Sequence, residues 1–123
     1  MELNKQVLKD LKSLRLGDLV RVEWVDASIG RSIGSSSIDV PVFSYGIYLG
    51  CLGERHKHII LAQNGFRYSN GFFDVDYTAI PVSWGMKVAA IKTGEVNPNT
   101  AQILLTSFLQ GRCRTLKRRK SNH

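Results

Sequence analysis

Residues 42–50 read Val-Phe-Ser-Tyr-Gly-Ile-Tyr-Leu-Gly, and they give the clearest indication of the fold class. Every second side chain from Phe43 to Leu49 is apolar, which is the period of a β-strand. Gly46 and Gly50 stand on the other face, and a glycine inside a strand marks a sharp bend or a close backbone approach. Because small β-barrels need strongly bent strands, this stretch predicts such a barrel.

Four further segments have the pattern of short strands, at residues 20–24, 58–62, 73–77 and 86–91. Between the first two strands, residues 26–41 are rich in serine and glycine, and we expect a long loop there. Asn64-Gly65 and Asn70-Gly71 are strong turn signals, so residues 63–71 are expected to form a loop or a small hairpin.

A helical period precedes and follows the strands. The first helix has apolar residues at helical spacing from Leu3 to Leu14 and is closed by Gly17. The second is expected to begin at Asn99 as N-cap and to stop at Gly111. We therefore predict a mostly β fold: a small, bent, antiparallel five-stranded barrel with an N-terminal helix in residues 1–94. A C-terminal helix in residues 95–111 would pack on the barrel or on a partner, and residues 112–123 would form a basic flexible tail.

The charge is concentrated at one end of the chain. The 123 residues include 17 Lys and Arg against 10 Asp and Glu, a formal charge of +7. Residues 112–123 carry six of these cations and no carboxylate, which leaves the remaining body at +1. This distribution excludes a uniformly basic chromatin-type protein and predicts a nearly neutral domain with a cationic tail.

Composition and length place the chain among single soluble domains. It is 43% hydrophobic and 22% charged, which is too apolar for disorder throughout. It has neither an apolar run of about 18 residues nor the continuous apolar core of a signal peptide at its start. Cys51 and Cys113 lack CxxC spacing and indicate free thiols. We expect a cytoplasmic protein with no membrane partner.

Four stretches resemble the Sm-like family over roughly residues 3–92: Leu16-Gly-Asp-Leu-Val-Arg-Val, Tyr45-Gly-Ile-Tyr-Leu-Gly, His58-Ile-Ile-Leu-Ala and Trp84-Gly-Met-Lys-Val. The resemblance implies an N-terminal helix capping a strongly bent five-stranded barrel. In the family, an Asp and an Asn before the third strand help to hold an RNA base, whereas this chain has Glu54-Arg-His-Lys-His58. Trp84-Gly85 stands where the family has an Arg-Gly pair. The resemblance therefore implies the fold without the family's uridine pocket.

The candidate binding residues are cations and aromatic side chains. The tail cluster is expected to neutralise phosphate, with arginines that add bidentate geometry; it is alternatively a solvated tail that aids solubility or a localisation signal. It consists of Arg112, Arg114, Lys117, Arg118, Arg119 and Lys120. Arg55, Lys57 and His58 form a second cluster, which is alternatively a solvated turn. Arg67, Tyr68 and Phe72 interleave charge with rings, as proteins that bind single strands do.

Metal binding and catalysis have weaker support. Cys51, His56 and His58 give a C-x4-H-x-H spacing, but structural zinc needs four ligands, so we predict no metal and no cofactor. Asp74 and Asp76 fit the solvated face of a strand better than an acid–base pair. Neither a phosphate-binding glycine loop nor a nucleophile elbow is present, and we expect no enzyme.

Two functional hypotheses follow. The first is a non-catalytic nucleic-acid-binding module, favouring RNA over DNA, whose cationic C-terminal tail contacts phosphates. The alternative is a protein-interaction module that forms a homo-oligomer through barrel edge strands and the C-terminal helix, because that helix is apolar on more than one side.

Overall fold

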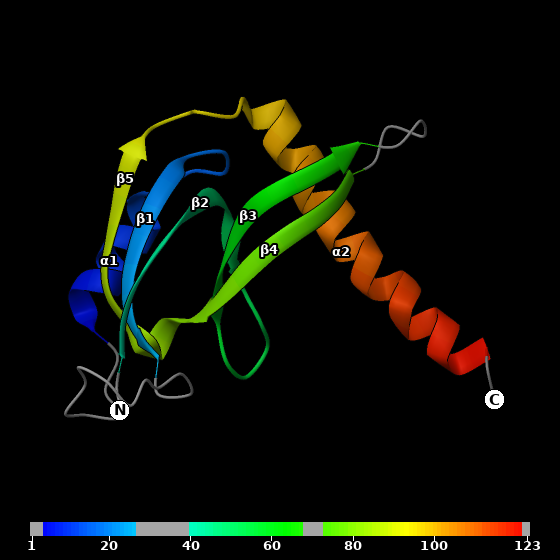
Figure 1. Cartoon of the computed structure of the whole chain (residues 1–123), viewed down its shortest axis with the longest axis horizontal. Helices are drawn as coiled ribbons and strands as arrows, with labels where there is room; N and C mark the ends of the chain where they lie inside the picture. Colours follow the sequence, from blue (N-terminus) through cyan, green and yellow to red (C-terminus); the bar gives the residue numbers. More distant parts are fainter. Residues whose placement is uncertain (1–3, 27–39, 68–72, 122–123) are drawn as a thin grey trace.

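The chain folds into a five-stranded antiparallel sheet with two α-helices (Figure 1). The computed structural model describes residues 4–26, 40–67 and 73–121, with side chains described for 4–26, 40–65 and 74–110. The elements are α1 (Lys5–Ser13), β1 (Leu19–Asp26), β2 (Val40–Leu52), β3 (His58–Arg67), β4 (Phe73–Pro81), η1 (Val82–Trp84), β5 (Gly85–Lys92) and α2 (Pro98–Ser121). The mostly β class and the five strands are confirmed. Most of the predicted serine- and glycine-rich loop lies outside the described residues.

The strand order is β4-β3-β2-β1-β5, and each neighbouring pair is antiparallel. Within the described ranges, β4 and β5 are the two edges of the sheet and do not pair with each other. The sheet is therefore not closed, and the predicted barrel is not confirmed.

β2 bends between two partners. Its residues from Val40 to Ile47 pair with β1, whereas those from Ile47 to Leu52 pair with β3. At Gly46 the backbones come so close that a Cβ would lie 2.8 Å from the Cβ of Leu61 and 3.0 Å from the carbonyl oxygen of Ala62. Glycine is required there because any side chain would push β3 away. The close approach predicted from the sequence is thus present at Gly46.

Each face of the sheet packs against one helix. α1 covers the first face with Val7 and Leu11, and the residues buried with them include Val20, Val22, Trp24, Ile59, Leu61, Ile80 and Val88. α2 covers part of the second face with Leu104 and Phe108, over Leu49, Ile60 and Ala62. The ring of Phe108 meets that of Tyr77 edge to face at a centroid distance of 4.8 Å. The apolar residues of β2 and β3 thus contribute to two hydrophobic cores, one on each face of the sheet.

Local hydrogen bonds fix α1 against β5. The side chain of Asn4 caps the helix by accepting from the backbone N–H groups of Gln6 and Val7, and its Nδ2 donates to the carbonyl oxygen of Met86. The helix ends at Ser13, before the predicted stop at Gly17. Gly17 instead lies in the turn that leads into β1, with a φ of 97°.

Three further predicted boundaries differ from the structure. The oxygen Oδ1 of Asn97, not Asn99, accepts from Thr100 N–H at the start of α2. The helix continues through Gly111 to Ser121, because the residues after this single glycine are mostly good helix formers. β3 extends to Arg67, so Asn64 and Gly65 pair with β4 instead of turning. Neither helix offers, within its described residues, the length of apolar sequence that crossing a membrane requires.

Candidate functional site

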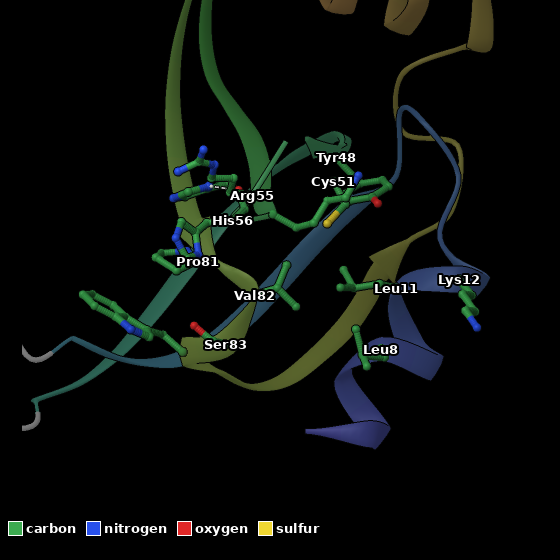
Figure 2. A pocket seen from close by; sticks show the side chains of 13 residues that line it. Leu8, Leu11, Lys12, Tyr48, Cys51, Arg55, His56, Pro81, Val82 and Ser83 are labelled. Carbon is green, nitrogen blue, oxygen red and sulfur yellow. Dashed lines mark hydrogen bonds between the residues drawn. The ribbon is translucent and has the colours of Figure 1, made fainter. Parts of the chain in front are cut away.

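A cavity of about 880 Å³ lies between α1, the end of β2, the β2–β3 turn and η1 (Figure 2). Its lining comes from distant parts of the chain: Leu8, Leu11, Lys12, Tyr48, Cys51, Arg55, His56, Lys57, His58, Pro81, Val82, Ser83 and Trp84. Figure 2 shows Arg55 and His56 on one side, with Leu8 and Leu11 of α1 opposite. Its volume is typical of small-molecule sites.

The β2–β3 turn places the polar side chains at this cavity. Gly53 has a φ of 134°, and a Cβ there would overlap the carbonyl oxygen of His56, so the turn needs glycine at this position. The carbonyl oxygen of Lys57 accepts a hydrogen bond of 3.0 Å from the N–H of Val82. That bond joins the turn to η1, and the two walls of the cavity are therefore held together by backbone contacts.

The charged groups of the lining are all basic. Lys12, Arg55 and Lys57 contribute formal positive charges, and no Asp or Glu stands among the described residues that line the cavity. The side chains of the turn are exposed, so water can reach them. A concave site with charges of one sign concentrates ions of the opposite sign. The chemistry of this cavity therefore favours an anionic ligand.

An aromatic pair forms the wall near η1. Trp84 lines the cavity and stacks on Trp24, with ring centroids 6.2 Å apart and an interplanar angle of 19°. Trp24 is buried and its Nε1 donates a hydrogen bond of 2.9 Å to Oγ of Ser44. This bond fixes the ring on which Trp84 rests. The site therefore combines positive charge with an aromatic ring held in a defined position.

Tyr48 and Cys51 lie close together at the apolar side of the cavity (Figure 2). Burial, with a contribution from the neighbouring Cys51, raises the pKa of Tyr48 to about 12. Burial also raises the pKa of the Cys51 thiol, and the positive charge of Lys57 partly offsets this rise. Both groups are thus protonated at neutral pH, which suits neutral hydrogen bonding better than nucleophilic attack.

The two histidines do not form a metal site with Cys51. Nδ1 of His58 lies 3.0 Å from the carbonyl oxygen of His56, and this contact requires the proton on Nδ1 because the oxygen can only accept. Across the described ranges, no three His, Cys, Asp or Glu side chains gather closely enough to hold a metal ion.

The structure brings together one of the predicted clusters. Arg55, Lys57 and His58 line the cavity. Arg67 stands at the opposite end of β3, roughly 30 Å along a strand of ten residues, and its side chain is not among those described. Tyr68 and Phe72 lie outside the described residues.

The six predicted tail cations all lie beyond Gly111. Most of this segment is part of α2, whose C-terminal end extends beyond the sheet (Figure 1). These cations are Arg112, Arg114, Lys117, Arg118, Arg119 and Lys120, and their side chains lie outside the described residues.

Sequence reasoning missed several lining residues. Nothing in the sequence pattern singles out Lys12, and Trp84 enters only where it stands in place of the family's arginine. Tyr48 lies on the face of β2 that the glycines mark, so its burial beside Cys51 follows from the bend. The available signal was Trp84 alone, since tryptophan is enriched in binding surfaces.

No protein-family model matches the chain, and neither a curated protein nor a solved structure does.

Proposed function

We propose that the protein is a non-catalytic module that binds single-stranded nucleic acid, RNA in preference to DNA. In this proposal the cavity holds one nucleotide, and the basic C-terminal part of α2 contacts neighbouring phosphates. The observation that carries the proposal is the lining itself: Lys12, Arg55 and Lys57 with a fixed Trp84 and no carboxylate among the described lining residues.

Each part of a nucleotide has a matching group in the cavity. Arg55 offers a bidentate fork to phosphate, and Lys57 offers a point charge beside it. Trp84 and His56 provide rings on which a base can stack. The hydroxyl of Ser83 is a hydrogen-bond partner for a 2′-hydroxyl, which is the group that distinguishes RNA from DNA.

The resemblance to Sm-like proteins is part of this proposal. A helix followed by five antiparallel strands is what the resemblance implies, and a closed, strongly bent barrel is its further implication. The cavity lies between the turn before β3 and the connection before β5, the two places where the sequence departs from the family's base-binding residues. We therefore propose a nucleotide site of different composition at this position, with Trp84 and Arg55 in place of the family's pattern.

Binding of a labelled single-stranded RNA of about 12 nucleotides at low salt tests the proposal. Arg55→Gln with Lys57→Gln should weaken binding at least fivefold and reduce the slope of log affinity against log salt by about 1. Truncation after Gly111 should weaken binding further, because it removes six cations.

The matched control removes the same charge elsewhere. Lys5 and Lys9 are exposed on α1 and do not line the cavity, so Lys5→Gln with Lys9→Gln should change affinity by less than about twofold. Unchanged affinity in both the cavity variant and the truncated protein would rule out the mechanism.

A homo-oligomeric assembly is the second candidate. The edge strand β5 carries Met86 and Ile91, each 53% exposed, and the edge strand β4 carries Tyr77, which is 43% exposed. An edge strand with exposed apolar side chains can pair with another chain. Sedimentation equilibrium measures the mass in solution; a monomer at all concentrations counts against assembly, and an oligomer that binds no RNA favours it over the first proposal.

A further inference from the structure

A second surface lies on the face of the sheet that α1 does not cover. Phe43 and Tyr45 are 57% and 50% exposed, although both are in the first half of β2 and pair with β1. Side chains two positions apart in a strand project from the same face, so the two rings stand side by side. The sequence pattern had placed both rings among the regularly alternating apolar positions of this strand, and their exposure is therefore unexpected.

The neighbours of these rings follow from the strand register. Tyr45 is opposite Arg21 on β1, and Phe43 is opposite Glu23, which is in turn opposite Lys87 on β5. Residues in register on adjacent strands share a face of the sheet. Two cations and one carboxylate thus flank the rings, and Nη2 of Arg21 lies 3.7 Å from Oε1 of Glu23.

α2 stops short of this surface. Ile47 and Leu49 of β2 pack against the cluster that α2 covers, whereas Tyr45 and Phe43 lie beyond it. Both rings are therefore exposed because α2 does not cover this part of the sheet, although the alternation of β2 is regular.

The backbone of the same stretch of β2 also carries, on its opposite face, a residue that contacts the cavity wall. Ser44, the residue between them, accepts the hydrogen bond from Trp24, and Trp24 stacks on Trp84 in the cavity wall. β3 pairs with β2 only from Ile47 onward, so the first part of β2 is an edge of the sheet in the described ranges. A single strand that passes around this edge would reach the face that carries Phe43 and Tyr45.

We infer that Phe43 and Tyr45 form a stacking platform for bases of a single-stranded nucleic acid, with Arg21 and Lys87 beside its backbone. The inference rests on the proposed function and extends it to a second surface. The two rings stand about 7 Å apart along the strand, wider than the 3.4 Å of stacked bases, which fits an extended strand. Arg21 is paired with Glu23, so Lys87 leaves this surface with one net positive charge, which favours a polyanion over an apolar protein partner.

The experiment compares two probes of equal length and charge: a single-stranded RNA of about 12 nucleotides and the same sugar–phosphate chain without bases. Phe43→Ile with Tyr45→Ile removes the rings but keeps apolar, strand-forming side chains. We expect this double variant to bind RNA about tenfold more weakly or worse than the wild type, and to bind the abasic chain equally well. Its salt dependence should match that of the wild type, because no cation is lost.

The matched control is Ile103→Ala with Leu109→Ala, which removes exposed apolar side chains from α2 and should leave the RNA affinity within about twofold. Circular dichroism checks that each variant remains folded. If the wild type binds RNA and Arg55→Gln with Lys57→Gln weakens binding while the ring variant does not, the platform is wrong and the cavity proposal stands. If the wild type binds no RNA, both fail. If the wild type is a dimer that the ring variant dissociates, the surface is a self-interface and the platform is overturned.

Discussion

The indole rings of Trp24 and Trp84 stack with their centroids 6.2 Å apart and their planes 19° from parallel. Trp24 belongs to the core under α1, whereas Trp84 lines the cavity, so this contact joins the hydrophobic core to the candidate site. Stacked rings of this kind contribute beyond the area that they bury. A ligand that contacts Trp84 therefore contacts a ring whose position is fixed by the fold before binding.

The reactivity of Cys51 should follow the environment of the cavity. In a Cys113→Ser background, we expect the rate of alkylation of Cys51 to rise with pH. The pH at the midpoint of this rise should be higher than for a free thiol, because burial raises the pKa of Cys51. Lys57→Met should move the midpoint higher still, because it removes the charge that stabilises the thiolate. Iodoacetamide kinetics across the pH range measure both midpoints, and a downward shift in Lys57→Met would contradict the assignment.

Tyr48 should make the protein sensitive to alkali. Its pKa of about 12 in the folded state exceeds the ordinary value of 10, so its contribution to stability is complete below pH 10 and is lost as the pH rises through 12. We expect the free energy of unfolding to fall by about 1 kcal/mol between pH 9 and pH 11 from this group. Urea titrations should show a smaller fall in Tyr48→Phe than in the wild type, and an equal fall in the two proteins would contradict this assignment.

Asp18 should be required for stability. It is 2% exposed, and its two carboxylate oxygens accept hydrogen bonds from the backbone N–H groups of Arg15 at 3.0 Å and Gly94 at 2.9 Å. Asp18→Ala leaves both N–H groups without this partner and should cost about 2–4 kcal/mol in urea unfolding. Asp10→Ala, which removes only an exposed contact to Gln6, should cost less than about 0.5 kcal/mol. Equal effects of the two substitutions would contradict this role.

The bend of β2 depends on the missing side chain at Gly46. Gly46→Ala places a Cβ 2.8 Å from the Cβ of Leu61 and 3.0 Å from the carbonyl oxygen of Ala62. Both of these atoms are fixed to the backbone of β3 and can move only if β3 moves. We expect a loss of about 1–3 kcal/mol in the free energy of unfolding. A stability equal to that of the wild type would show that β2 and β3 separate without cost.

The sequence predicted what depends on local periodicity. The strand predicted from alternating apolar residues in β2 and the helix predicted before β1 are both present in the structure. Both could be predicted because the spacing of apolar residues in a strand or a helix repeats within a few residues. Whether Phe43 and Tyr45 are buried depends on where α2 crosses the sheet, and no local pattern contains that information. The same applies to the open sheet, since closure is a relation between β4 and β5 and not a property of either strand.

The candidate site was predictable only in part. Arg55 and Lys57 were identified as a cationic turn, and the structure adds Lys12 and Trp84 from distant segments. Arg67 is predicted, with Tyr68 and Phe72, to contact nucleic acid, but β3 continues past Asn64-Gly65 and carries Arg67 to the end of the strand opposite the cavity. Pairing with Asp76 and Val75 outweighed the turn preference of that dipeptide.

Protection of Cys51 tests the occupancy of the cavity most directly, because its thiol lines the site. In the Cys113→Ser protein, a saturating single-stranded RNA should slow the alkylation of Cys51 at least threefold. The slowing should disappear in Arg55→Gln with Lys57→Gln and persist in Lys5→Gln with Lys9→Gln. If the RNA binds, as measured by anisotropy, and the alkylation rate of Cys51 is unchanged, the nucleotide does not occupy the cavity and the account is contradicted.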